Sequence, residues 1–174
     1  MTGVSDRSVN GWGPAHSKIV TWHDPAALAV AGSELSGLQL LEAIRTGQLP
    51  PPPIAQLIGA ELVSVADGEA VFRCTPDEAT YNPLGLVHGG LLCTLLDSAA
   101  GCAVQTTLPA GTGYSSIEIK VSFLRALRVG SGAVEVHGRA LKVGRTVAFA
   151  EAHARDEGGE LIGHATSSLA LMRG

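Results

Sequence analysis

Four residues near the middle of the chain have types and a spacing suited to holding a polar ligand. His88 is followed by Gly89 and Gly90, and Asp97 lies seven residues after Gly90. A helix that starts on glycines offers unpaired backbone N–H groups, the positive end of its dipole and room for a ligand to approach. Such a start could hold a carbonyl oxygen or an oxyanion, although two glycines could also form only a tight turn into a helix.

The element that positions these residues is a long apolar helix. Asn82-Pro83 and Gly85 break regular structure, whereas the chain from Leu91 to Thr107 contains only one breaker, Gly101, so we expect a helix from Gly89 or Gly90. Asp97 is the single charged residue in it, whereas a surface helix would carry several, so we expect a helix buried on nearly all sides. A buried carboxylate needs hydrogen-bond partners or a catalytic use. The aliphatic face of the helix would comprise Leu91, Leu92, Leu95, Ala99, Cys102 and Ala103, with Asp97 on the opposite face among Gly90, Cys93, Thr94, Gly101 and Val104.

Alternating strands would wrap this helix. Residues 60–66 and 69–74 flank Asp67-Gly68, a strong hairpin signal, and strands near 116–123, 133–141, 146–155 and 161–171 follow the helix. In the first of these four, Ile117, Ile119, Val121 and Phe123 would share one face, with Ser116, Glu118, Lys120 and Ser122 on the other. The strand at 146–155 has alanine at every second position, which would let a helix lie close; the alanines are Ala148, Ala150, Ala152 and Ala154.

The N-terminal third divides into a polar tail and short helices. Residues 1–22 are rich in Gly, Ser and Thr without a period, which predicts a mobile tail. Helices are expected over 25–31, 36–46 and 54–58. We therefore divide the chain into an N-terminal extension, residues 1–34, and one domain, residues 35–174.

Composition excludes several classes of protein. The 174 residues carry a net charge of −4, which argues against a nucleic-acid binder. No run is long enough to span a membrane, and no signal segment is evident. Three cysteines, an odd number, favour a reducing compartment, so we expect a cytoplasmic protein. His137, His153 and His164 fall in separate strands without the helical spacing of a zinc site, and no metal is expected.

Basic residues cluster at two places. Arg125 and Arg128 close one strand, while Lys142 and Arg145 flank a tight turn. These side chains could converge on a phosphorylated ligand, or they could be ordinary solvated strand ends.

The segment N-P-x-G-x-x-H-G-G from Asn82 to Gly90, with Asp97 further along the helix, resembles the PaaI-type hotdog-fold acyl-CoA thioesterases. The resemblance extends from Leu35 to Leu171 and includes the K-x-G-R turn. It implies an α+β hotdog fold, in which a six-stranded antiparallel sheet of order 1-2-4-5-6-3 wraps around the long helix. It also implies homodimers formed through the third strands, and a homotetramer built from two dimers.

The resemblance implies roles for individual residues at a site shared between subunits. Gly89 N–H and the Asn82 side chain would polarise the thioester carbonyl, His88 would organise the loop, and Asp97 of the neighbouring subunit would act as general base or as nucleophile. Ser116 would orient the water, although the adjacent Ser115 is an alternative. No cofactor is expected, because coenzyme A (CoA) is part of the substrate; it would run along Phe123, Arg125, Arg128, Lys142, Gly144, Arg145 and Thr146.

Two other functions remain open from the sequence. A hotdog hydratase or dehydratase would use a His with Asp or Glu as acid and base, whereas a non-catalytic acyl-CoA-binding module would not need Asp97. Aromatic residues make up only 4% of the chain, so an acyl pocket lined by Leu, Val and Ala is expected; the acyl group itself is not identified.

Overall fold

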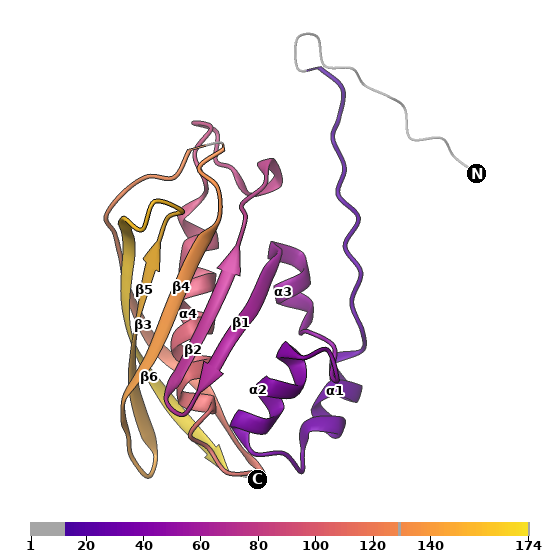
Figure 1. Ribbon diagram of the computed structural model, residues 1–174, viewed down its shortest axis with the longest axis vertical. Helices are drawn as coiled ribbons and strands as arrows, with labels where there is room; N and C mark the ends of the chain where they lie inside the picture. The colour runs from indigo at the N-terminus through magenta and orange to yellow at the C-terminus, as the bar shows by residue number, and fades with distance from the viewer. Residues whose placement is uncertain (1–12, 129, 174) are drawn as a thin grey trace, which may run out of the picture.

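The computed structural model describes residues 13–128 and 130–173. Along the chain, three short helices come first, and the long helix follows the second strand and precedes the third (Figure 1). The elements are α1 (Pro25–Gly32), α2 (Gly37–Arg45), α3 (Pro53–Ile58), β1 (Ala60–Ala66), β2 (Glu69–Cys74), the 3-10 turn η1 (Glu78–Thr80), α4 (Gly89–Gln105), β3 (Thr112–Phe123), β4 (Val134–Val143), β5 (Val147–Arg155) and β6 (Leu161–Arg173).

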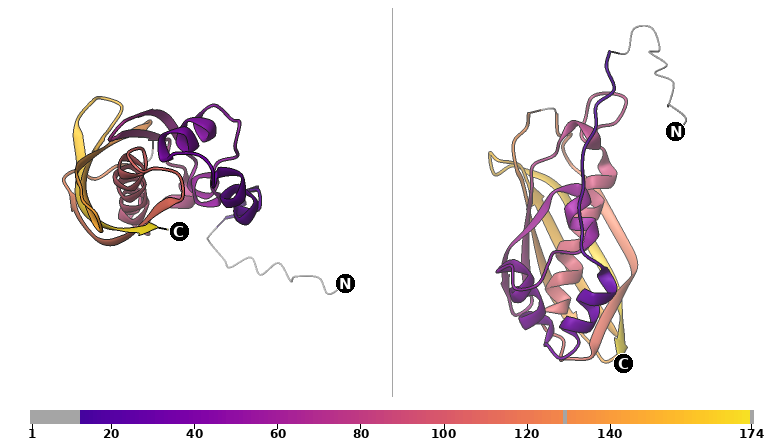
Figure 2. Two further views of the ribbon diagram at one scale, coloured as in Figure 1. Left: turned by 90° about the horizontal axis from the view of Figure 1, so that it is seen from below. Right: turned by 90° about the vertical axis from the view of Figure 1, so that its right-hand side faces the viewer.

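The six strands form one antiparallel sheet that curves around α4. The strand order is β1-β2-β4-β5-β6-β3, so β1 and β3 form the two edges. Viewed along the helix, the sheet surrounds α4 on most sides, and the N-terminal helices lie beyond β1 (Figure 2). The expected strand order and hotdog architecture are confirmed.

Small residues let the helix and the sheet approach closely. The four alternate alanines of β5 are all buried, as the sequence predicted. A very close approach lies on the neighbouring strand β4, where a Cβ added to Gly138 would lie 2.0 Å from the backbone oxygen of Ala99 on α4. Backbone therefore packs on backbone at this crossing, a contact that the alternation did not reveal.

One side of α4 is not covered by the sheet. Cys93, Asp97, Ser98 and Cys102 are only half-buried, whereas Leu95, on the sheet side, is 1% exposed. The expectation that the helix is buried on nearly all sides is therefore wrong for a single chain, because the curved sheet leaves a gap between β3 and β1. We call this half-buried side of α4 the open stripe.

The described part of the N-terminal extension contacts the turn before α4. Residues 13–22 form no helix or strand, and residues 1–12 of the predicted tail lie outside the described residues. Lys18 Nζ donates to Asp77 Oδ2 at 2.5 Å, and His16 pairs with Glu78. Among the described helices, none has the length and apolarity needed to span a membrane.

Candidate active site

His88 closes the start of α4. Its backbone N–H donates to Thr80 O at 2.9 Å, and its side-chain Nδ1 accepts from Gly90 N–H at 2.8 Å. Leu91 N–H bonds to the His88 carbonyl, and Gly89 N–H, a first-turn donor with no acceptor inside the helix, is left without a hydrogen-bond partner among the described residues. The helix start therefore presents one free, fixed donor.

Asn82 builds the loop before the helix with one side of its amide. Its Oδ1 accepts from Leu84 N–H at 2.9 Å and from Leu86 N–H at 3.1 Å. Its Nδ2 has no partner within the described part of the chain. The loop thus fixes a second donor group near the helix start.

Both donors lie at one pocket of about 330 Å³. Asn82, His88 and Gly89 line it together with Phe123 and Arg125. Phe123 lies against the helix start, because a Cβ on Gly89 would be 3.2 Å from its Cζ. The helix start and the end of β3 therefore form one cavity.

Asp97 has a hydroxyl partner on the neighbouring edge strand. Ser116 Oγ on β3 donates to Asp97 Oδ1 at 2.8 Å, whereas Ser115 is exposed and makes no such contact. Ser116, of the two candidate serines, is therefore the one beside the carboxylate.

A β-bulge aims Ser116 at the helix. The pairing with β6 shifts between Ser116 and Glu118, so Ile117 is the extra residue and its side chain is 60% exposed. The predicted alternation is therefore wrong at this point: Ser116 shares the inner face with Ile119, and Ile117 does not. Strict alternation holds only without a bulge.

A single chain does not bring the donors at the start of α4 close to the Asp97 carboxylate. Asp97 lies eight residues after Gly89 on the same helix, a separation of about 12 Å at 1.5 Å per residue. The free donors and the carboxylate are therefore too far apart within one chain to act on the same carbonyl carbon.

The two basic clusters also lie apart within one chain. Phe123 and Arg125 are level with Ala154 at one end of β5, and Arg125 pairs with Asp156 at 3.6 Å. Lys142 lies near the end of β4, and Gly144, Arg145 and Thr146 form the β4–β5 turn, at the other end of the hairpin and about 23 Å away over seven strand residues. Convergence of these clusters in a single chain is excluded, because an antiparallel hairpin puts its turn opposite its open ends.

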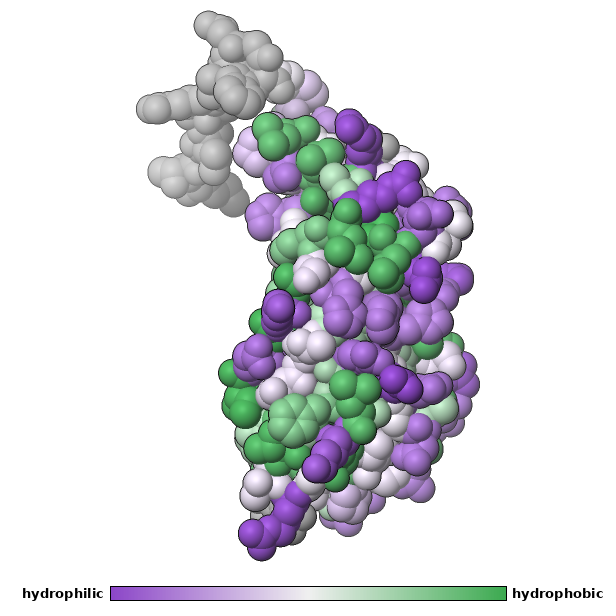
Figure 3. All heavy atoms as spheres, turned by 90° about the vertical axis from the view of Figure 1, so that its left-hand side faces the viewer, coloured by the Kyte–Doolittle hydropathy of each residue, from purple (hydrophilic) through white to green (hydrophobic). Residues whose placement is uncertain are grey.

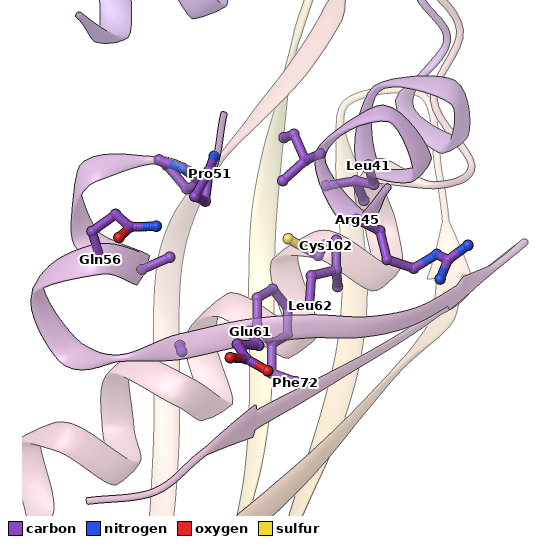
Figure 4. A pocket seen from close by; sticks show the side chains of 12 residues that line it. Leu41, Arg45, Pro51, Gln56, Glu61, Leu62, Phe72 and Cys102 are labelled. Carbon is purple, nitrogen blue, oxygen red and sulfur yellow. The ribbon is translucent and has the colours of Figure 1, made fainter. Parts of the chain in front are cut away.

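A second pocket, of about 280 Å³, lies between the N-terminal helices and the sheet (Figure 4). Leu41 of α2, Pro51, Leu62 of β1 and Phe72 of β2 line it, and Cys102 points into it from α4. Burial raises the pKa of the Cys102 thiol to about 12. The sequence did not predict this pocket, although the apolar positions of residues 36–46 indicate a helix with one face packed against the rest of the protein.

The fold and the site geometry define a hotdog-fold protein, and comparisons with known proteins agree. Residues 84–162 match the family model of the Thioesterase superfamily. Acyl-coenzyme A thioesterase 13 of Mus musculus is 33% identical over 89 residues, 51% of this chain and 62% of the relative.

Solved structures extend the likeness across most of the chain. A thioesterase family protein from Silicibacter pomeroyi superposes with a TM-score of 0.69 at 25% identity, over 77% of this chain and 99% of that one. The Escherichia coli PaaI protein gives a TM-score of 0.69 at 17% identity, over 82% and 97%, which shows the shared fold.

The resemblance to the PaaI-type hotdog thioesterases is therefore confirmed. The matching segment spans less than two thirds of the length of the first curated relatives.

Proposed function

We propose that this protein hydrolyses acyl-CoA thioesters at sites shared between two subunits. The observation that carries the proposal is the pair of half-sites: a capped helix start with a free Gly89 N–H, and a half-buried Asp97 held by Ser116. Each half has a task in thioester hydrolysis, and a second copy of the chain would supply the missing half.

In the proposed reaction the thioester carbonyl oxygen accepts hydrogen bonds from Gly89 N–H and Asn82 Nδ2. Donors fixed in advance stabilise the charge that develops on this oxygen, and one such donor is typically worth about 2.7–4 kcal/mol. The partner subunit's Asp97 takes a proton from water, whose oxygen bonds to the carbonyl carbon. The C–S bond then breaks, and the sulfur of CoA leaves as a thiolate that takes up a proton.

The open stripe of α4 is where the second subunit would lie. Its half-buried residues include Asp97 and Cys102, and β3, which carries Ser116, is an unpaired sheet edge beside it. Pairing of β3 with its copy would cover both the stripe and the edge. We propose a homodimer of this kind, and an association of two dimers into a homotetramer.

The acyl group would enter the pocket of Figure 4. Cys102 lies about 7.5 Å along the helix from Asp97, and both border the open stripe. The lining is mainly aliphatic, with Leu41, Ala55 and Leu62 beside Phe72. Ala55→Leu should therefore shift activity toward shorter chains in a panel from acetyl-CoA to long-chain and aryl-acetyl CoA; an unchanged ranking would place the acyl group elsewhere.

Thiol release from acyl-CoA tests the hydrolysis itself. Asp97→Asn should lower kcat about 10²- to 10⁴-fold, the usual worth of a general base. Ser116→Ala should cost less, and Ser115→Ala is its matched control because that serine does not face Asp97. Near wild-type turnover of a folded Asp97→Asn protein would overturn the mechanism. Binding of acyl-CoA without thiol release by the wild type would identify a binding module, and hydration of an enoyl-CoA would identify a hydratase.

Mixing two inactive variants tests the shared site. A dimer of one Asp97→Asn chain and one Asn82→Ala chain has one intact site if the two halves come from different subunits. Random mixing should then restore about a quarter of wild-type activity. No recovery, with native mass spectrometry showing mixed dimers, would mean that the halves do not meet across subunits.

A further inference from the structure

Three histidines form a row on the outer face of the sheet. His153 on β5 lies directly opposite His137 on β4 and His164 on β6. Figure 3 shows a band of hydrophilic side chains across the middle of this side of the molecule, between apolar patches. The histidines fall in separate strands, as the sequence indicated, and the strand register places them side by side.

Two of these histidines and a glutamate are close enough to share a ligand. The rings of His153 and His164 are 4.7 Å apart between centroids and tilted by 42°. Glu151, two residues before His153 on β5, points to the same face. One potential ligand atom from each of the three residues lies within 4.8 Å of the other two, and all three side chains are half-buried.

We propose that Glu151, His153 and His164 bind a divalent transition-metal ion of the zinc class. Two imidazoles and a carboxylate are a common three-ligand set for zinc, with the fourth position left for water. Metal–ligand bonds of about 2.0–2.2 Å in a tetrahedron need ligand atoms about 3.3 Å apart. Rotation of side chains on adjacent paired strands, whose Cβ atoms are about 4.5–5.5 Å apart, can close the remaining gap.

The neighbouring Arg139 orients the Glu151 carboxylate but bonds to only one of its two oxygens. Arg139 Nε and Nη2 both donate to Glu151 Oε1, at 3.2 and 2.8 Å, so the second carboxylate oxygen, Oε2, remains for the metal. Such outer partners hold a ligand in place. The positive charges of Arg139 and Arg155 oppose a cation, but Arg139 is 62% exposed, so solvent and salt screen it.

The third histidine of the row already has a partner. His137 Nε2 is paired with Glu135 Oε1 at 2.7 Å. It is the matched control for the other two histidines.

This metal site is separate from the proposed hydrolytic site. The residues between and beside the histidines, Ala152, Ala154 and Ala165, face inward and are fully buried against the core. The sheet thus lies between the metal ligands and α4. Binding should change stability rather than the chemistry at Asp97, and the inference does not depend on the proposed hydrolysis.

Calorimetric titration of the full, untagged, metal-free chain with Zn²⁺ tests the proposal. The wild type should bind one ion at this site. His153→Gln and His164→Gln should weaken binding by more than the about 10- to 100-fold typical of losing an outer-shell partner, whereas His137→Gln should bind like the wild type. Zn²⁺ should raise the Tm of the wild type and of His137→Gln only, because a ligand that binds the folded state stabilises it.

Substitution of Co²⁺ for Zn²⁺ identifies the ligand atoms. The expected visible spectrum is that of a nitrogen and oxygen site without thiolate charge transfer. No saturable binding by the wild type, an equal loss in His137→Gln, or a thiolate band that assigns the metal to a cysteine would each overturn the proposal. Thioester hydrolysis should be unchanged in His153→Gln, which separates this site from the catalytic one.

Discussion

Substitution of Gly138 by alanine tests whether α4 packs directly on the backbone of β4. The new Cβ would lie 2.0 Å from Ala99 O and 2.3 Å from Ala99 C, whereas real Cβ contacts essentially never fall below 3.0 Å. Both atoms are backbone, so no side chain can turn away. The helix and the strand must separate by about 1 Å, which already forfeits a quarter to a half of the dispersion energy of the contacts between them.

The cost should lie at the upper end of the range for overpacking. Such insertions cost about 1–3 kcal/mol, and the gain from replacing a strand glycine is about 0.5–1 kcal/mol. We expect a net loss of about 2 kcal/mol or more, which lowers Tm by at least about 4–8 °C in a chain of this size.

Urea and thermal unfolding followed by circular dichroism measure this loss. Gly113→Ala, on the edge strand β3, is the control, because a Cβ there would be 4.0 Å from the nearest atom, the Met172 Cε. It should be neutral or slightly stabilising. A Gly138→Ala protein as stable as wild type would refute the close helix–sheet contact, and with it the position of α4 on which the placement of Asp97 depends.

Three further predictions concern the site and the sheet. Asn82→Asp keeps the Oδ1 that accepts from Leu84 N–H and Leu86 N–H but removes the Nδ2 donor. The kcat should therefore fall while Tm stays near wild type. A rise in KM alone would assign Asn82 to ground-state binding. Arg125→Glu and Lys142→Glu should each weaken binding of a full CoA thioester more than of a truncated pantetheine thioester, and equal losses would assign these residues to the fold. Burial lowers the pKa of His153 from its ordinary 6.5, so the unfolded chain binds a proton more readily than the folded one. The contribution of the neutral His153 to the free energy of unfolding is therefore present above pH 6.5 and is lost as pH falls through the lower pKa of the folded state. Urea titrations should show this fall in the free energy of unfolding in wild type and a shallower one in His153→Gln.

The site could be predicted from the sequence in its parts but not in its assembly. The motif around Asn82, His88 and Gly89 is contiguous, so the breakers and the start of α4 were readable from local residues alone. The partner of Asp97 was not readable to the same degree, because Ser116 faces it only through the bulge at Ile117. The distance between Asp97 and Gly89 followed directly from helix geometry.

The sequence by itself determined the elements and their order. Breakers, alternation and helical periodicity are local properties, so the six strands, the long helix and the alanine row of β5 followed from them, and the strand order came with the family resemblance. Only the tertiary structure decided where Gly138 meets α4, which way Ser116 points, and that His153 lies beside His164. Each of these depends on the register between segments remote in the sequence, and register is set by how the whole sheet pairs and packs.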